Sequence, residues 1–145
     1  MRIGVTGTRW GMNKVQNLTI KRILLDAYMG DYDELHHGDC VGVDEQVALM
    51  AHEYRVVAHP PISTMWQSKL TAERNDFVWP PKPFLERNRD IVDVTHLLLV
   101  VPRYTHEELR SGTWTTYRYA KEIHRPMKII YPDGSVVNKT DKTNS

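Results

Sequence analysis

The sequence holds only one cysteine, Cys40, among its 145 residues. A single cysteine cannot form a disulfide within the chain, nor a zinc site built from several thiolates. No apolar run approaches the roughly 18 residues of a membrane-spanning helix. The apolar stretch within residues 1–7 is too short for a signal peptide and reads as a strand. We therefore expect a cytoplasmic protein without a membrane segment.

The chain also lacks an excess of either charge. Nineteen Lys and Arg residues stand against eighteen Asp and Glu residues, which gives a formal net charge of +1. A nearly neutral molecule has no long-range field that draws it to DNA or to anionic lipid. Its 41% hydrophobic and 26% charged residues are typical of an ordinary soluble domain. This composition argues against nucleic acid as the main partner.

Apolar runs alternate with helical periodicities along the chain. The predicted strands cover residues 2–6, 34–37, 55–59, 96–101 and 127–131, and the predicted helices begin near Asn13, Val43, Pro83 and Thr113. The run 96–101 is almost entirely apolar, as expected for a central parallel strand buried on both faces. The pattern predicts an α/β, Rossmann-like three-layer fold with a mostly parallel sheet of about five strands.

Two segments fall outside this alternation. Residues 62–83 carry Trp66 and Trp79 without a clear period, and we predict a long excursion with a short helix over 65–74. Such an excursion serves as a lid or a subunit contact, and its apolar surface predicts a homo-oligomer, a dimer or higher. Residues 138–145 are polar and are predicted to be a disordered tail behind one domain, residues 1–137.

Three glycine-containing turns follow predicted strands, at residues 6–9, 37–42 and 111–114. In an open parallel sheet, ligands bind at the carboxyl ends of the strands, where such turns gather. Glycine lets the backbone approach a ligand, and free N–H groups at a helix start attract phosphate. That all three turns are only helix caps stays open as the alternative. The predicted ligand-binding residues are Gly7, Thr8, Arg9, Gly38, Asp39, Arg87, Ser111, Gly112, Thr113 and Trp114.

Two of these residues have an alternative interpretation. Arg87 would neutralise phosphate, or it would belong to a solvated helix face with Glu86 and Asp90. Trp114 would stack on a base, or it would pack in the core. The adjacent pair His36 and His37 points to opposite faces of a strand, so we expect no metal site there.

The order of three motifs resembles the SLOG superfamily: Glu86-Arg87, then a strand ending in residues 100–102, then Ser111-Gly112-Thr113 at a helix start. That superfamily includes the Lonely-guy phosphoribohydrolases, the DprA/Smf DNA-processing proteins and the ligand domains of nucleotide-derivative sensors. The turns at Gly7 and Gly38 also fit its small YspA-like members. The resemblance covers about residues 1–131. It implies a Rossmann-like fold, a phosphate or ribose contact at Arg87, and oligomers of identical subunits.

The chain departs from the Lonely-guy enzymes at one critical place. Those enzymes carry a Pro-Gly-Gly-x-Gly-Thr turn followed at once by a catalytic glutamate. Here residues 103–111 separate Pro102 from Gly112, and Trp114 follows Thr113. N-glycosidic cleavage needs a carboxylate near the ribose, and none stands at the expected position.

The sequence therefore predicts binding of a phosphorylated nucleoside, a nucleoside monophosphate or an ADP-ribose-like molecule, by a sensor or sequestering protein without a cofactor. The alternative is a nucleotide N-glycosidase in which a loop carboxylate, with Asp39 and Asp44 as the candidates, replaces the missing glutamate. A third interpretation is single-stranded DNA binding, for which the sequence offers no basic run.

Overall fold

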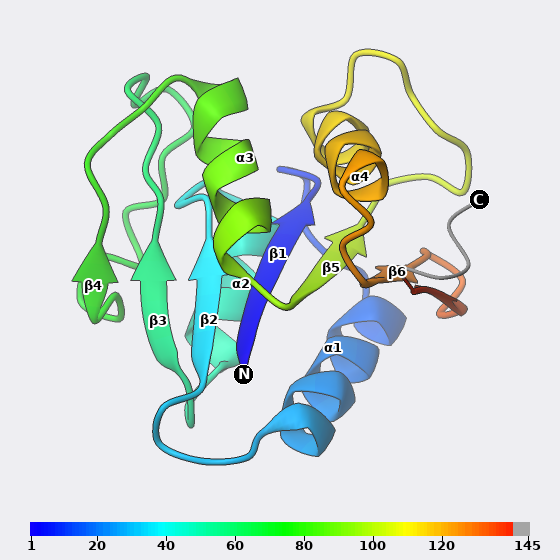
Figure 1. Ribbon diagram of the computed structural model, residues 1–145, viewed down its shortest axis with the longest axis horizontal. Helices are drawn as coiled ribbons and strands as arrows, with labels where there is room; N and C mark the ends of the chain where they lie inside the picture. Colours follow the sequence, from blue (N-terminus) through cyan, green and yellow to red (C-terminus); the bar gives the residue numbers. More distant parts are fainter. Residues whose placement is uncertain (141–145) are drawn as a thin grey trace.

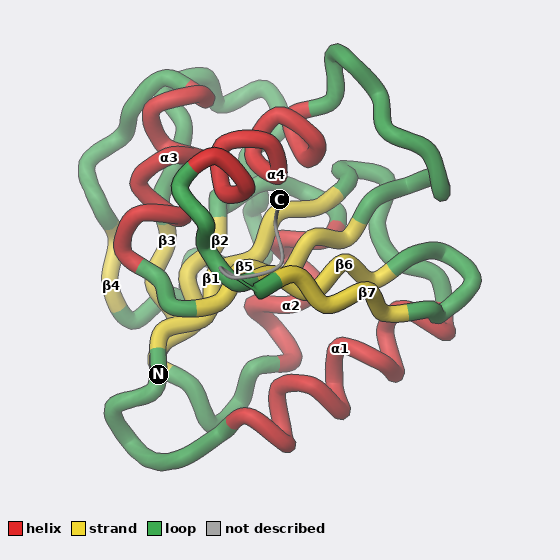
Figure 2. Tube along the Cα trace, turned by 45° about the vertical axis from the view of Figure 1, so that its right-hand side comes forward, coloured by secondary structure: helices red, strands yellow, loops and turns green. Residues whose placement is uncertain are grey.

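The central strand β5 (Leu97–Val101) carries apolar residues on both faces, and this pattern calls for a layer of helices on each side. Leu98 and Val100 lie in one hydrophobic cluster and Leu99 and Val101 in the other, and all four are fully buried. The computed structural model describes residues 1–140. One face of the sheet is covered by α3 (Phe84–Val94) and α4 (Gly112–Glu122), and the other by α1 (Lys14–Ala27) and α2 (Val43–Met50) (Figure 2). The predicted three-layer α/β architecture is confirmed.

The sheet has the strand order β4-β3-β2-β1-β5-β6-β7, and only β7 is antiparallel to its neighbour. The remaining strands are β1 (Arg2–Gly7), β2 (Glu34–His37), β3 (Arg55–Ala58), β4 (Phe77–Val78), β6 (Met127–Ile130) and β7 (Val136–Lys139). From β1 the chain adds β2, β3 and β4 on one side of the sheet, and from β5 it adds β6 and β7 on the other side. The strand order therefore reverses between β1 and β5 (Figure 1). A crevice at the carboxyl ends of such a pair is where open α/β sheets bind ligands.

Seven strands form this sheet, where the sequence predicted about five. One additional strand, β4, is a two-residue edge strand within the excursion. The other, β7, extends into the predicted polar tail, because the turn at residues 132–134 returns the chain alongside β6. Asn138 and Lys139 therefore pair with Lys128 and Met127 rather than starting a disordered tail. The end of the predicted tail, residues 141–145, lies outside the described residues.

The short helix predicted over 65–74 is wrong, because residues 62–76 form turns and bends. Several of their hydrogen bonds go to the turn after β2, and the backbone bonds within the segment are those of single turns. The Asp39 carboxylate accepts from Gln67 Nε2 at 2.8 Å and from Thr71 Oγ1 at 2.7 Å, and the Asp39 carbonyl accepts from the Ser68 amide at 2.8 Å. One buried carboxylate thus fixes the path of the excursion, whose role as a lid or subunit contact stays a prediction.

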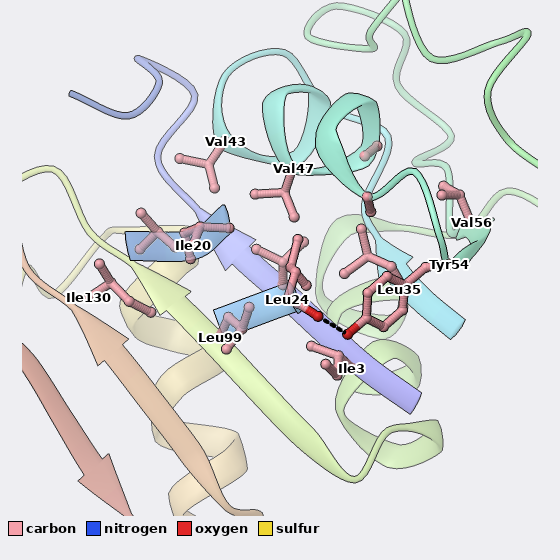
Figure 3. Close-up of a cluster of buried hydrophobic side chains, with 14 residues drawn as sticks. Ile3, Ile20, Leu24, Leu35, Val43, Val47, Tyr54, Val56, Leu99 and Ile130 are labelled. Carbon is pink, nitrogen blue, oxygen red and sulfur yellow. Dashed lines mark hydrogen bonds between the residues drawn. The ribbon is translucent and has the colours of Figure 1, made fainter. Parts of the chain in front are cut away.

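The core beneath β1 and β5 holds α1 and α2 against the sheet (Figure 3). Ile20 and Leu24 of α1 are buried against Ile3 of β1 and its neighbours. The hydroxyl of Tyr54 donates to the Leu24 carbonyl oxygen at 2.6 Å, which satisfies a buried polar group inside this cluster. Within residues 1–140, none of the helices is long and apolar enough to cross a membrane.

The buried amide of Gln16 connects α1 to the carboxyl ends of two strands. Its Nε2 group donates to the carbonyl oxygens of Pro102, at 3.1 Å, and Ile130, at 3.0 Å. Its backbone amide donates to Asn13 Oδ1 at 2.9 Å, and Gln16 Oε1 accepts from the Asn13 amide at 3.2 Å, which forms a capping box. Gln16 therefore fixes the point at which the chain leaves β5.

We predict that Gln16→Ala lowers the free energy of unfolding by about 2–4 kcal/mol, because it leaves two buried carbonyl groups unsatisfied and breaks the capping box. Urea denaturation followed by circular dichroism measures this loss. Asn17→Ala, in the same helical turn, serves as the control and is expected to change stability by less than about 0.5 kcal/mol. Equal losses in the two variants would contradict the role of Gln16.

Candidate functional site

A cavity of about 530 Å³ opens at the carboxyl ends of β1 and β5, where the strand order reverses. Its volume lies within the range of small-molecule sites. Its walls include the loop after β1, the first turns of α3, and the segment that leads from the end of the β5–α4 loop into α4. Seven of the ten predicted ligand-binding residues line it, namely Gly7, Thr8, Arg9, Arg87, Ser111, Gly112 and Thr113. The fold thus brings together two of the three predicted turns, and the part these residues play in binding stays a prediction.

The N-terminus of α4 faces the cavity with free backbone donors. Ser111 caps the helix, and its side chain accepts from the Trp114 amide at 3.4 Å. Within residues 1–140 the amides of Gly112 and Thr113 have no hydrogen-bond acceptor, as is usual in a first helical turn. A Cβ atom on Gly112 would meet no protein atom within 4 Å. Glycine is therefore not required there for packing, and the free amides give the cavity a positive dipole end.

Arg87 of α3 lies at the cavity but is only 5% exposed. Its Nη1 group donates to the carbonyl oxygens of Gly38 and, at 3.2 Å, of His59. Its Nη2 group lies 3.6 Å from the Cys40 sulfur. Its Nε group is buried and finds no acceptor in the part of the chain that the structure describes. A buried donor without a partner is costly, and the guanidinium of Arg87 keeps one such hydrogen-bonding group unsatisfied beside the cavity.

The interpretation of Arg87 as part of a solvated helix face is wrong. Asp90, its proposed neighbour on that face, pairs instead with Lys82 Nζ at 2.7 Å. Arg87 turns inward because Gly38 has no side chain: a Cβ atom on Gly38 would overlap the guanidinium of Arg87. Gly38 itself is buried and lies outside the cavity wall. The absence of a side chain at this position makes room for Arg87 and not for a ligand. This corrects the ligand-binding role predicted for Gly38.

Asp44 of α2 places a buried carboxyl group in the cavity wall. Its Oδ2 atom accepts from the Gly38 amide at 3.1 Å. Burial raises the pKa of Asp44 to about 6, while the charge of Arg87 and the amides of Gly38 and Cys40 act in the opposite direction. A carboxyl group with such a pKa can exchange a proton near neutral pH.

Asp39, the other catalytic candidate, does not line the cavity. It adopts a positive φ of 60°, and its carboxylate is taken up by Gln67 and Thr71 of the excursion. Because both carboxylate oxygens of Asp39 accept hydrogen bonds from the excursion, they hold that segment in place. The ligand-binding and catalytic roles predicted for Asp39 therefore do not fit the structure.

Trp114 belongs to the core and not to the cavity. It is 2% exposed and packs edge-on against Tyr117, with ring centroids 5.2 Å apart. Stacking on a base is therefore excluded by burial, and the core alternative holds. The aromatic surface of the cavity comes instead from Trp10, Trp66 and Phe84. Trp10 directly follows the Gly7-containing turn, and this position is the signal by which it could have been predicted.

Two further arginines line the cavity without having been predicted. Arg103 and Arg110 lie in the connection between β5 and α4, the long loop seen in Figure 1. This loop has no periodicity, so the side chains that face the cavity could not be identified from the sequence. The neighbouring Glu108 also lines the cavity. The wall thus holds four arginines and two carboxyl groups.

The raised pKa of Asp44 predicts a specific dependence of stability on pH. Between about pH 4 and pH 6 the folded protein keeps a proton on Asp44 that the unfolded chain has released. The free energy of unfolding of the wild type should therefore fall, relative to Asp44→Asn, as the pH rises through this window. A shift of about 2 pKa units corresponds to roughly 2–3 kcal/mol.

Urea denaturation of both proteins at pH 4, 5, 6 and 7 measures this difference. The stability gain of Asn over Asp should grow across the series and level off above pH 6. A difference that stays constant from pH 4 to pH 7 would show that Asp44 titrates normally in the folded protein.

No family model matches the sequence, and no curated protein matches it at a significant level. Solved structures do share its fold. A molybdenum cofactor binding protein from the phototrophic bacterium Rippkaea orientalis is 18% identical, with a TM-score of 0.62 over 88% of this chain and 74% of that chain. A Moco carrier protein from Chlamydomonas reinhardtii is 16% identical, with a TM-score of 0.60 over 90% and 75%. The structural genomics target TM1055 is 14% identical, with a TM-score of 0.59 over 87% and 71%. At these identities the likeness shows a common fold, the Rossmann-like α/β architecture.

Proposed function

We propose that this protein binds a phosphorylated nucleoside, a nucleoside monophosphate or an ADP-ribose-like molecule, and holds it as a sensor or sequestering protein. The observation that carries this proposal is the buried guanidinium of Arg87, whose Nε group has no acceptor within residues 1–140. Arg87 lines the same cavity as Gly112 and Thr113, whose backbone amides are free. Guanidinium groups and helix N-termini both favour phosphate, and here both serve one cavity.

The charge balance around Arg87 supports the same ligand class. The guanidinium is held by carbonyl oxygens and so keeps its full positive charge. Burial raises the pKa of Asp44 in the same cavity wall despite the attraction of Arg87. The wall holds four arginines against two carboxyl groups, and a phosphate would balance this excess of positive charge.

Two further observations support a binding role. The resemblance to the SLOG superfamily implies a phosphate or ribose contact at Arg87. The solved structures with this fold include proteins described as a molybdenum cofactor binding protein and a Moco carrier protein. Those descriptions concern proteins that hold a small molecule, and this is the class of function that we propose here.

We predict that the wild type binds AMP and that Arg87→Lys weakens this binding roughly 10- to 100-fold, the range for hydrogen bonds to charged groups. Lysine keeps the charge but loses the Nε donor and the planar fork. Arg89→Ala, an exposed arginine of the same helix whose guanidinium lies over Tyr119, is the matched control and should bind normally. Titration calorimetry measures affinity, and a thermal melt of each variant checks folding.

Gly112→Val provides a second test that does not disturb Arg87. Its Cβ atom meets open space in the protein, so the variant should fold and yet obstruct the free amides. The absence of AMP and inorganic phosphate binding at millimolar concentration would overturn the proposal. So would full affinity in both folded variants.

A second candidate function is N-glycosidic hydrolysis, which Asp44 favours. Its buried carboxyl group lies in the cavity wall, and its pKa of about 6 suits a general acid or base. The turn at Gly112-Thr113 lacks the following glutamate of the Lonely-guy enzymes, and this argues against turnover.

We predict that AMP is recovered intact after incubation, as measured by native mass spectrometry of the complex and chromatography of the supernatant. Release of free base in proportion to protein concentration would instead establish a glycosidase. Asp44→Asn would then abolish the release if Asp44 were the catalytic carboxylate.

A further inference from the structure

A row of alternating arginine and aromatic side chains lies at the mouth of the cavity. The Cζ atom of Arg9 is 4.3 Å from the ring centroid of Trp66 and 5.4 Å from that of Trp10. The Cζ atom of Arg103 is 4.7 Å from the Trp10 centroid and 5.1 Å from the Tyr104 centroid. We call these five residues the arginine–aromatic ladder. It joins the excursion, the loop after β1 and the loop after β5.

The ladder holds its two arginines in place without neutralising them. A cation–π contact engages the face of the guanidinium and leaves its N–H edges free for other acceptors. Within residues 1–140, Arg9 and Arg103 form no ion pair, and their side chains donate no hydrogen bond. Both are exposed and both line the cavity. They therefore present two unpaired positive charges to whatever enters.

These two charges lie at a different depth from that of Arg87. Arg87 is 5% exposed and is anchored to the ends of β2 and β3. Arg9 and Arg103 are exposed on loops at the mouth. A single phosphate that meets Arg87 and the α4 amides fills the deep position and leaves the mouth arginines without a counter-ion. The cavity wall thus offers two sets of cationic groups, one buried at Arg87 and one exposed at Arg9 and Arg103.

We infer that the ligand carries two linked phosphates, as in a nucleoside diphosphate or a pyrophosphate-bridged dinucleotide, with the first at Arg87 and the second at the arginine–aromatic ladder. This inference rests on the proposed function and narrows it. Of the two ligands proposed above, it selects the ADP-ribose-like molecule over the nucleoside monophosphate. Trp10 is 63% exposed and contacts the guanidinium groups of both Arg9 and Arg103, so its ring holds the two arginines at the mouth of the cavity.

Calorimetric titration with two matched pairs of probes tests the inference. The pairs are inorganic phosphate against pyrophosphate, and AMP against ADP, all at one ionic strength. The wild type should bind the second member of each pair at least tenfold more tightly. Arg103→Gln and Arg9→Gln should each lower the affinity for ADP more than the affinity for AMP, and so reduce that preference. Arg89 lies on α3 and does not belong to the ladder, so Arg89→Gln should bind all four probes with the affinities of the wild type.

The outcomes separate this inference from the proposed function. If AMP binds and ADP binds no more tightly, the two-phosphate inference fails while the phosphate site at Arg87 stands. If neither binds, both fail. If the preference for ADP survives in the Arg9→Gln/Arg103→Gln double variant, the second phosphate does not lie at the ladder, and the inference is overturned as stated.

Discussion

The carboxyl edge of the sheet depends on the burial of one guanidinium, that of Arg87. It reaches from α3 to the main-chain carbonyls that follow β2 and β3, and so it connects a helix to the ends of two strands. The contact exists only because Gly38 leaves the space free. Since carbonyl oxygens and not a carboxylate hold the guanidinium, its charge is available to the cavity. Arg87 therefore contributes to both the shape and the charge of the site.

Buried polar side chains fix the remaining walls. Gln16 anchors the departure of the chain from β5, and Asp39 anchors the excursion that carries Trp66. Each of them bridges segments that lie far apart in the sequence. Walls that are already ordered lose little conformational entropy when a ligand enters, which favours binding by a small molecule.

The architecture was predictable because its signals are local. Alternating periods and the apolar run of β5 identify the layers, and the carboxyl ends of parallel strands share one edge wherever the turns occur. Gly7 and Ser111 could therefore be assigned to one site. The inward turn of Arg87 could not be foreseen, because it depends on a missing Cβ atom 49 residues away. The ladder was equally hidden, since its partners lie on three loops without periodicity. The ligand-binding roles predicted for Asp39 and Trp114 do not fit the structure. The sequence does not show which groups a turn residue contacts, nor which residues in the first turn of a helix face the core.

Nuclear magnetic resonance gives the most direct test of the phosphate site. In ¹H–¹⁵N spectra, the backbone amides of Gly112 and Thr113 and the Nε–H group of Arg87 have separate signals that can be followed during a titration with inorganic phosphate. All three should shift together and saturate with one dissociation constant, because one anion would accept hydrogen bonds from all of them. Shifts confined to exposed lysine and arginine regions, with these three signals unmoved, would contradict the account.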